Sequence, residues 1–440
     1  MDMIHGPLAG KLLLFAIPLM LSSMLQLLFN AADIVVVGRF AGKEALAAVG
    51  SNTALINLVT NLFIGLSVGA NVVIANYLGA GKKEEICKTL HTGIVMALMA
   101  GFFVLVVGII FAKQFLIWMV CPQDVIRLST IYLRIFFLGM PAMMVYNFGS
   151  AMMRAFGDTR RPLYYLFVSG ILNVILNLIL VIVFSMSVAG VAIATVVSQY
   201  MSAGLVIRCM MREKGEMHLS LRKLRLDRAT ARKIIGIGLP AGFQGTVFSL
   251  SNVVIQSSIN SFGSVVIAGS AAASNVEGFV YMAMNAFHQT AITFAGQNYG
   301  ARDIGRVKRV MGLCLLYVTI TGLLLGQAVV FFATPLLHIY SQDMAVIVAG
   351  IVRMKYVCSL YFLCGVMDVL VGILRGMGRA VMPMIVSILG ACGLRLVWIA
   401  TVFVHIRKPE ILYLSYPVSW TITLSVHFIC LFYLLKKEAK

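Results

Sequence analysis

A single carboxylate, Asp33, lies within a long apolar stretch near the beginning of the chain. A charged side chain inside a membrane-length apolar segment is costly, and it usually faces a cavity or a partner. Asp33 falls near the outer, C-terminal end of the first predicted helix, where the helix dipole disfavours an anion. In an apolar cavity a carboxylate favours its protonated form, so Asp33 could bind and release a proton. The structural alternative is an interfacial acid solvated at the outer mouth.

Three polar residues recur at intervals of four further along the chain: Ser169, Asn173 and Asn177. They share one helical face, and amides in hydrocarbon need hydrogen-bond partners. The row could therefore meet Asp33, and Thr195 in the next predicted helix adds a hydroxyl. We predict a cation or proton site at Asp33, Asn173, Asn177 and Thr195, with Na⁺ as the candidate metal because hard cations prefer oxygen ligands. The alternative is that these side chains only hold helices together.

Four other polar residues are candidates for a substrate cavity: Gln26, Asn147, Glu277 and Asp368. Gln26 precedes Asp33 by two helical turns and could line the same pocket. Glu277 could bind a cationic substrate or a coupling proton, or be a solvated acid at the start of a helix. For Asp368, a structural contact towards the cytoplasmic end is the alternative to a binding role.

The remaining titratable residues predict little chemistry. Arg395 lies deep in an apolar stretch, and we expect it to pair with an acid or with polar backbone. His91 and His288 are expected to be packing residues. The eight Cys are scattered without a CxxC pair, so neither a disulfide framework nor a bound metal cluster is predicted. We expect no enzyme and no cofactor, since the acids are few and dispersed.

The elements that must position these residues are membrane helices. Hydrophobic residues make up 60% of the 440 positions and charged residues 12%, whereas soluble domains average near one half and one quarter. The apolar segments are long enough to cross a bilayer as helices. We predict twelve spans, at residues 11–38, 46–76, 88–112, 128–152, 162–184, 188–210, 232–259, 265–297, 307–333, 346–372, 382–405 and 413–435.

The net charge of +19 predicts topology rather than nucleic-acid binding. With the N-terminus inside, 25 Lys and Arg fall on the cytoplasmic side and nine on the outer side, the latter including Arg353. This asymmetry places both termini in the cytoplasm. We expect a multi-pass protein of the cytoplasmic (inner) membrane, with the lipid bilayer as a partner and no nucleic acid.

The two halves of the chain repeat each other about 221 residues apart. Arg154-Ala-Phe-Gly-Asp-Thr-Arg-Arg-Pro162 recurs as Arg375-Gly-Met-Gly-Arg-Ala-Val-Met-Pro383. Pro18 and Asn30 recur as Pro240 and Asn252, but Asp33 is matched by Ile255. Likewise Leu394 and Trp398 replace Asn173 and Asn177, so the polar cluster belongs to the first half alone.

Six spans precede and six follow the basic segment from Arg212 to Lys233. An even number of spans gives both copies the same orientation, as in transporters with parallel repeats. We predict an all-α integral membrane protein with an N-terminal six-helix lobe at 1–211, a cytoplasmic linker at 212–231 and a C-terminal lobe at 232–440. No Walker A sequence is present, so an ion gradient is the expected energy source.

Several motifs together resemble the multidrug and toxic compound extrusion (MATE) family over nearly the whole chain, closest to its prokaryotic DinF-like branch. They are Ile17-Pro-Leu, Gln26, Asn30-Ala-Ala-Asp33, Gly38-Arg39, Gly79-Ala-Gly, Arg154-Ala-Phe-Gly-Asp158, Gly296-Gln-Asn-Tyr-Gly-Ala301, Leu374-Arg-Gly-Met-Gly378 and Tyr416-Pro-Val-Ser-Trp420. The resemblance implies two six-helix lobes in a V shape and a first-lobe cation site at positions 33, 173, 177 and 195. Relatives in this group often carry a second acid where this chain has Asn177, and its loss favours protonation of Asp33 over Na⁺ binding.

The leading hypothesis is a secondary active antiporter, working by alternating access between two lobes. It would export cationic or amphipathic compounds in exchange for H⁺ or Na⁺, and we expect a monomer. One alternative is a flippase for an amphipathic lipid or glycan intermediate, although such a cavity should carry several Arg. A membrane-embedded enzyme would need clustered acids or a nucleophile–base pair. A passive channel gives no reason for the two-lobe repeat.

Overall fold

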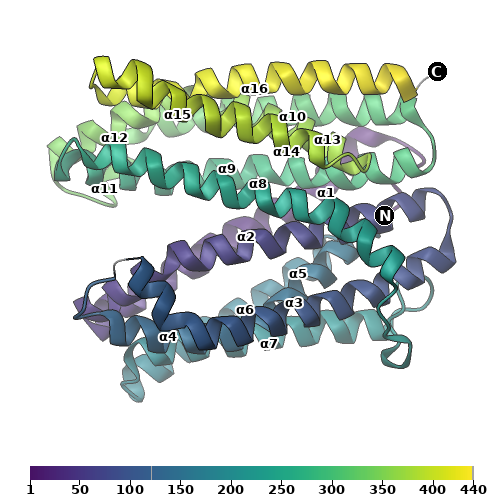
Figure 1. Cartoon of the computed structure of the whole chain (residues 1–440), viewed down its shortest axis with the longest axis horizontal. Helices are drawn as coiled ribbons and strands as arrows, with labels where there is room; N and C mark the ends of the chain where they lie inside the picture. Colours follow the sequence, from purple (N-terminus) through teal and green to yellow (C-terminus); the bar gives the residue numbers. More distant parts are fainter. Residues whose placement is uncertain (120, 439–440) are drawn as a thin grey trace. The chain divides into compact units, whose positions relative to one another are not determined.

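The computed structural model describes residues 1–119 and 121–438, and these residues form helices joined by short loops, with no strand among them (Figure 1). In the first half the helices are α1 (Leu8–Val36) with its π-helical extension η1 (Val37–Ala41), α2 (Lys43–Gly79), α3 (Lys83–Trp118), α4 (Ile126–Leu138), α5 (Met140–Ala155), α6 (Arg160–Leu178) with the π-helical η2 (Ile179–Val183), and α7 (Ser187–Arg212). A 3₁₀ turn, η3 (Leu221–Lys223), follows in the linker.

The second half repeats this order. Its helices are α8 (Arg228–Asn260), α9 (Ser264–Gly300), α10 (Ile304–Phe331), α11 (Ala333–His338), α12 (Met344–Val357), the 3₁₀ turn η4 (Cys358–Leu360), α13 (Phe362–Gly376), α14 (Val381–Ser387), η5 (Ile388–Gly393), α15 (Leu394–Trp398), η6 (Ile399–Phe403) and α16 (Pro409–Glu438). The segments η5 and η6 are π-helical, so residues 381–403 form one nearly continuous helix with α14 and α15.

Ten helices in the described residues are long and apolar enough to span a membrane, and two bent pairs raise this number to twelve. The bent pairs are α4 with α5, at 47°, and α12 with α13, at 44°. The twelve expected spans correspond to these elements, but residues 128–152 and 346–372 are not straight helices. The first bend falls at Gly139, beside Pro141, whose missing N–H weakens the helical ladder. The second falls after the tighter 3₁₀ turn η4.

The backbone reproduces the sequence repeat. Gly42 before α2 has φ 89°, and Gly263 before α9 has φ 88°. Gly81 and Arg302, at the equivalent loops after those helices, have φ 67° and 60°. Left-handed conformations are rare enough that their recurrence 221 residues apart reflects one structural unit used twice.

Contacts divide the chain into two compact units whose boundaries lie inside helices. The first unit holds Met1 and residues 21–242, and the second holds residues 2–20 and 243–440. Each boundary falls two residues after a proline within a helix, Pro18 in α1 and Pro240 in α8. The expected lobes at 1–211 and 232–440 differ from these units in the first halves of α1 and α8.

Two glycine pairs attach the beginning of α8 to α2 within the first unit. Gly65 and Gly69 on α2 face Gly238 and Gly242 on α8, a GxxxG pair on each helix that lets the backbones approach closely. A Cβ on Gly242 would lie 2.1 Å from the carbonyl oxygen of Leu62. Because that atom is backbone, no side-chain movement could make room for it.

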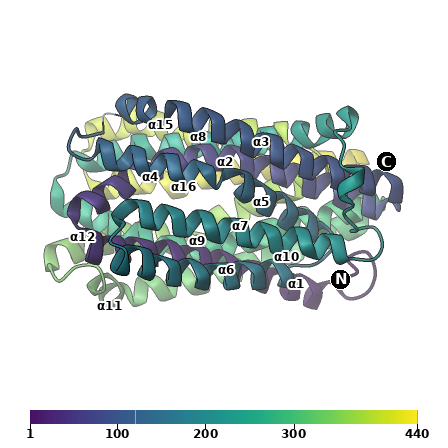
Figure 2. The ribbon, with the colours of Figure 1, turned by 90° about the horizontal axis from the view of Figure 1, so that it is seen from below.

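The corresponding part of α1 packs on the second unit through apolar side chains. Leu12 and Phe15 are fully buried, and the Phe15 ring meets Phe294 of α9 edge-on with centroids 5.4 Å apart. Within this unit α9 contacts α10, α12 and α13. In the first unit α6 and α7 run side by side (Figure 2).

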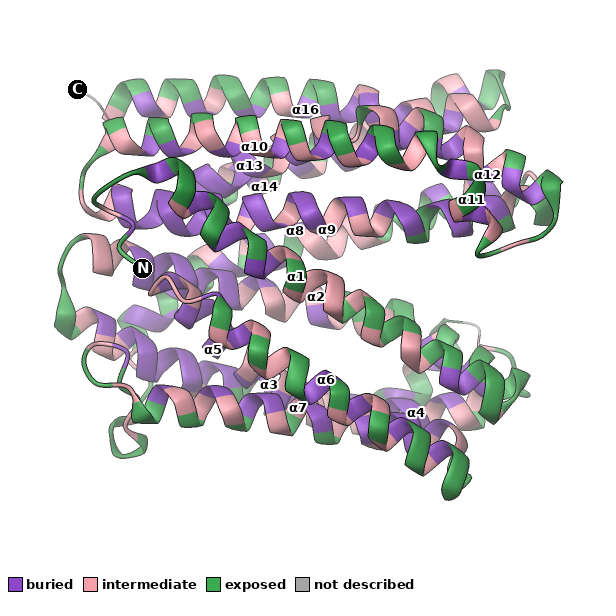
Figure 3. Ribbon diagram, turned by 180° about the vertical axis from the view of Figure 1, so that it is seen from behind, coloured by how far each residue is buried: buried purple, intermediate pink, exposed green. Residues whose placement is uncertain are grey.

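Large apolar side chains cover the outer faces of the helices. Figure 3 shows long exposed stretches on α10 and α16, where Leu324, Ile429 and Phe432 are all at least 65% exposed. Contiguous apolar surface of this extent is unfavourable in water and is suited to lipid. The fold is therefore that of a multi-pass membrane protein.

The linker is attached to the N-terminal third of α3. The His91 ring accepts a hydrogen bond from the Ser220 amide at 3.1 Å, and the Thr92 hydroxyl accepts one from the Asp227 amide at 3.2 Å. Asp227 in turn caps α8, accepting from the Thr230 hydroxyl at 2.6 Å and from the Thr230 amide at 2.8 Å. These bonds hold the pKa of the Asp227 carboxyl below its usual value.

Candidate functional site

The structure brings the four residues of the expected coupling site together in the first unit. The Asn177 amide donates to Oδ1 of Asp33 and also lies 3.3 Å from Oδ1 of Asn173. Nδ2 of Asn173 lies 3.4 Å from Oγ1 of Thr195, whose hydroxyl donates to the carbonyl of Val191 at 3.0 Å. One polar chain therefore joins α1, α6 and α7.

The chain of polar side chains directs N–H groups, not oxygens, at its single carboxylate, Asp33. Asn173 and Asn177 are 5% and 1% exposed, and Asp33 is half-buried. Oδ1 of Asn177 is buried without a hydrogen-bond partner in the described residues. A charged Asp33 gains a charge-assisted hydrogen bond from Asn177. Protonation weakens that bond, so the contact between α1 and α6 depends on the protonation of Asp33.

Both helices that supply the contact change their winding just beyond it. The π-helical η1 begins four residues after Asp33, and the π-helical η2 begins two residues after Asn177. The two segments contact each other, and η1 also contacts α7. Single π-helical turns inside α-helices occur frequently at functional sites because they re-aim side chains.

A glycine sets the approach of α1 to α6 one turn before the Asp33 contact. Gly170 packs directly against the ring of Phe29, and a Cβ on Gly170 would lie 1.9 Å from that ring. Phe29 precedes Asp33 by four residues and Gly170 precedes Asn173 by three, so the contact lies on the same helical faces. Gly170 therefore sets how closely α1 approaches α6 at the expected coupling site, and it has no side chain to take part in chemistry there.

Sequence reasoning missed Tyr132, on α4. Its side chain is 7% exposed and lies within Coulombic range of the Asp33 carboxylate. A signal for it exists in the repeat, because residue 353, which is 221 positions later, is an arginine between apolar neighbours. A comparison of the two copies at this position would have indicated a buried polar site in each.

The four residues proposed for a substrate cavity are divided between the units. Gln26 is exposed on α1, and the Asn147 amide donates to the Met143 carbonyl of its own helix at 2.9 Å. Glu277 and Asp368 belong to the second unit. No single unit contains all four.

Glu277 forms a buried ion pair with Arg353. Nε and Nη2 of Arg353 donate to the two carboxylate oxygens at 2.9 and 2.8 Å, and Nη1 donates to Ser270 at 2.8 Å. The side chains are 7% and 8% exposed, so Glu277 is not a solvated helix-start acid. Close packing of Gly269 on α9 against Gly350 on α12 brings the two helices together for this pair. The sequence had indicated Arg353 as an outer-side charge, whereas its side chain is buried.

Asp368 takes part in a network on α13. Its backbone carbonyl lies 2.5 Å from Nδ1 of His288 on α9, and its carboxylate interacts with the Tyr281 hydroxyl and with the charge of Arg375. Arg375 in turn donates to Gln244 at 2.8 Å. Arg375 acts on the Asp368 carboxylate through its charge, but the two side chains form no ion pair within the described residues.

Arg395 has a neutral hydrogen-bond partner. Its Nε donates to the Ser419 hydroxyl at 2.9 Å, and its guanidinium lies over the rings of Tyr416 and Trp420, 4.3 and 5.6 Å from their centroids. The side chain thus relies on a polar side chain and on aromatic faces, and no acid within the described residues forms an ion pair with it.

Known proteins match both copies of the repeat. The MatE family model matches residues 18–179 and again residues 240–401, which are two segments of equal length covering most of the chain. The chain belongs to the MatE family. Its two matched segments are offset by 222 residues, as Asp33 is from Ile255 and within one residue of the 221 that separates Arg154 from Arg375, so the family model and the internal comparison identify the same repeat.

Relatives of this MatE protein cover its full length. The probable multidrug resistance protein YoeA of Bacillus subtilis is 29% identical over 93% of this chain and 90% of its own. The probable multidrug resistance protein NorM of Thermotoga maritima is 24% identical over 88% and 84%. An FAD transporter of Shewanella oneidensis is 24% identical over 78% and 76%.

Solved structures confirm the fold of this MatE protein. An outward-facing multidrug resistance MATE transporter of the MOP superfamily superposes with a TM-score of 0.93, at 18% identity over 99% of this chain and 98% of its own. A MOP superfamily transporter from Pyrococcus furiosus also gives 0.93, at 19% identity over 100% and 98%. The DinF-like branch stays a prediction.

Proposed function

We propose that this protein is a secondary active antiporter that exports cationic or amphipathic compounds in exchange for protons, with Asp33 as the coupling residue. One observation carries the proposal: the sole carboxylate of the first-unit polar chain is held by Asn177, and the second copy has Ile255 at that position, 1% exposed in an apolar cluster. A reversible charge is therefore built into one copy only. The names of the Bacillus and Thermotoga relatives support drugs as substrates.

The donor set favours a proton over Na⁺. A Na⁺ site needs several converging oxygens, whereas Asn177 directs its N–H groups at both Asp33 and Asn173. In this polar chain the oxygens that accept no amide hydrogen bond are Oδ2 of Asp33 and Oδ1 of Asn177. A carboxylate that loses its charge also loses about half the strength of its hydrogen bond to an amide. Protonation thereby couples ion binding to the packing of α1 against α6.

In this proposal, the protonated and charged states of Asp33 favour different positions of α1, and alternating access follows from that bias. Export works because proton and substrate compete for the same state of the protein. The charge asymmetry supports a cytoplasmic-membrane protein with both termini inside, and we propose that it acts as a monomer. The Shewanella relative named as an FAD transporter supports a substrate range in the family wider than drugs.

The test is dye efflux from proteoliposomes under an imposed pH gradient, comparing the native protein with Asp33→Asn. Efflux should fall to the level of empty vesicles in Asp33→Asn, because the amide cannot exchange a proton. The matched control is Asp124→Asn, which removes the same charge from an exposed loop residue and should leave efflux unchanged. Undiminished efflux in Asp33→Asn refutes the coupling role. Efflux driven by a Na⁺ gradient at uniform pH refutes proton coupling.

A further inference from the structure

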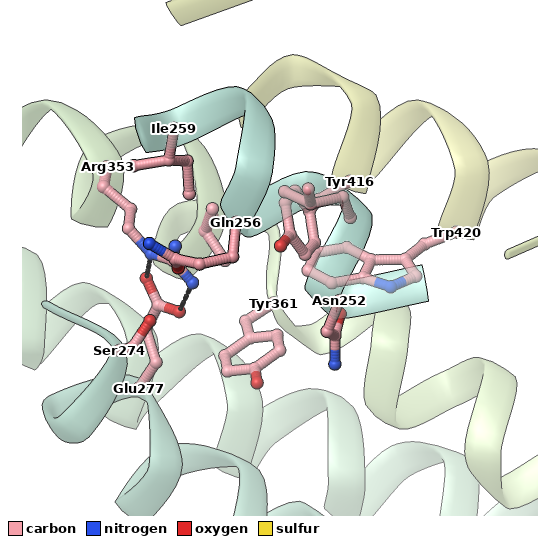
Figure 4. A pocket seen from close by; sticks show the side chains of 11 residues that line it. Asn252, Gln256, Ile259, Ser274, Glu277, Arg353, Tyr361, Tyr416 and Trp420 are labelled. Atoms are coloured by element: carbon pink, nitrogen blue, oxygen red, sulfur yellow. Dashed lines mark hydrogen bonds and ion pairs between the residues drawn. The ribbon is translucent and has the colours of Figure 1, made fainter. Parts of the chain in front are cut away.

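The second unit contains a pocket of about 230 Å³ that the proposed coupling mechanism does not use. Figure 4 shows the Glu277–Arg353 pair on one side of it and the rings of Tyr416 and Trp420 on the other, with Tyr361 between them. Its volume is below the roughly 300–1,000 Å³ of pockets for drug-sized ligands. The pocket is therefore matched to a ligand with a single ring system.

The pocket occupies the repeat position of the Asp33 site but differs from it in chemical character. Its lining includes Ile255, the counterpart of Asp33, and Tyr416, which lies 221 residues after Thr195. Arg353 likewise lies 221 residues after Tyr132. The second copy thus has an aliphatic side chain in place of the acid, an aromatic ring in place of the Thr195 hydroxyl, and a guanidinium in place of the Tyr132 ring.

Donors remain on the lining arginine after its internal bonds are counted. A guanidinium carries five N–H groups, and the bonds of Arg353 to Glu277 and Ser270 use three. The Glu277 carboxylate already accepts two of those bonds and is neutralised by the pair. Arg353 therefore retains two N–H donors for a ligand, whereas the charge of Glu277 is already neutralised by Arg353.

A second guanidinium lies behind the aromatic wall without a counter-ion. Arg395 is 8% exposed, and its one hydrogen bond within the described residues is to a neutral hydroxyl, that of Ser419. Both Arg395 and Arg353 lie over the ring of Tyr416, at 4.3 and 5.9 Å from its centroid. A buried cation with only neutral partners is costly. The pocket lining together with the residues packed on the Tyr416 ring carries two arginines and one acid, so an anion bound in the pocket offsets the remaining positive charge.

The aromatic wall is built to stack a planar ring. Tyr361 and Trp420 are nearly parallel, with centroids 5.3 Å apart, and Tyr416 meets Trp420 edge-on at 5.7 Å. Such faces and edges are the surfaces on which aromatic ligands pack. Ile255 and Ile259 supply apolar contact on another side.

We propose that this second-unit pocket binds small planar aromatic compounds that carry one carboxylate, with the ring packed against the wall formed by Tyr361, Tyr416 and Trp420. The carboxylate is held by the free N–H groups of Arg353 and by the field of Arg395. Export of such a ligand rests on the proposed antiport function, whereas its binding to the pocket is independent of that function. Binding is therefore tested on protein in detergent, where no gradient exists.

Trp420 provides the signal, since the chain has three tryptophans and the other two, Trp118 and Trp398, do not line the pocket. In a Trp118→Phe/Trp398→Phe background, Trp420 fluorescence is titrated with three compounds sharing one quenching ring. They are 4-nitrobenzoate, 4-nitrobenzylamine and 4-nitrotoluene, which are anionic, cationic and neutral. We expect saturable quenching by the anion at a Kd about tenfold below that of the cation, or ~1.4 kcal/mol.

Charge removal then identifies the source of the preference. Arg395→Gln keeps a donor for Ser419 but should bring the three affinities to within about twofold, which corresponds to a few tenths of a kcal/mol. Lys355→Gln removes the same charge from an exposed position on α12 and should keep the preference. Asp33→Asn should also keep it, so a protein inactive in efflux still reports on this pocket. An unchanged Trp420 emission spectrum without ligand and an unchanged Tm show that Arg395→Gln remains folded.

Three results overturn the proposal. Non-saturating quenching by all three compounds shows only collision with the ring. Equal affinities in the unsubstituted pocket show an apolar pocket without charge selection. Tighter binding of 4-nitrobenzylamine shows that Glu277 dominates and that the ligand class is cationic.

Discussion

Replacing Arg353 by Met should destabilise the second unit strongly, because it leaves the Glu277 carboxylate buried without its cation. The pair is more than nine-tenths buried and has two short charged hydrogen bonds. Removing one partner of such a pair costs about 3–5 kcal/mol of unfolding free energy. Glu277→Gln should cost less, about 2 kcal/mol, because Arg353 keeps its bond to Ser270 and its contact with the Tyr413 ring, 5.7 Å away.

The double variant separates the value of the pair from the cost of breaking it. In Arg353→Met/Glu277→Leu no charge is left buried, and such apolar replacements are often nearly neutral, so the loss should be within about 1 kcal/mol. Glu277→Leu is the second single variant of this cycle, and the losses of Arg353→Met and Glu277→Leu together should exceed the double loss by about 3 kcal/mol or more, a coupling that only contacting residues show. Lys355→Met, an exposed position on the same helix, should change stability by less than about 0.5 kcal/mol.

The assay is reversible unfolding in mixed micelles of mild detergent and dodecyl sulfate, followed by tryptophan fluorescence and by loss of helical circular dichroism. Coincidence of the two signals justifies a single free energy for each variant. A loss below about 1 kcal/mol for Arg353→Met would contradict a buried, paired geometry. Additive effects in the double variant would show that the two side chains do not interact.

Three further substitutions test other contacts. Gly170→Ala should cost about 1–3 kcal/mol, since its Cβ meets the Phe29 ring, and proteoliposome efflux should drop with it; native efflux would show that this contact does not position the coupling site. Gly242→Ala should cost a similar amount, because its Cβ would collide with the Leu62 carbonyl, and a Tm equal to that of the native protein would exclude the GxxxG packing. Asp227 has a lowered pKa in the folded state, so its contribution is present above its unfolded value near 3.9 and is lost as pH falls through the folded value. The Tm difference between native protein and Asp227→Ala should accordingly vanish in acid, and a difference that persists there would contradict capping by the carboxylate.

The fold could be predicted because the length of apolar stretches and the distribution of Lys and Arg are properties of the sequence alone. Apolar stretches give the spans, and the repeat gives the duplication. The bends at Gly139 and at η4 were not predicted, because they interrupt apolar stretches without adding polar residues. The unit boundary at Gly242 depends on glycine packing between α2 and α8, and the boundary at Met20 depends on apolar packing of α1 against α9; in both cases the helices are far apart in sequence.

The polar chain of the first unit could be anticipated because Asn173 and Asn177 share a helical face and because a carboxylate within an apolar stretch, such as Asp33, needs a polar partner. The ion pair of the second unit could not, since 76 residues separate Glu277 from Arg353 and no spacing rule links them. Arg353 was misplaced because loop charges and buried charges look alike near the end of an apolar stretch.

Each unit includes a half-helix from the other half of the sequence, and this affects how such a chain can be divided and how it could have arisen. Residues 2–20 complete the second unit, and residues 228–242 are part of the first. A cut in the linker at residues 213–227 therefore leaves each fragment with a half-helix that belongs to the other. A single copy of the repeat could complete its unit only by exchanging this half-helix with an identical partner, that is, by domain swapping. Fusion of two such copies makes the exchange of half-helices intramolecular. The effective concentration of the exchanged half-helix then no longer depends on how much protein is expressed.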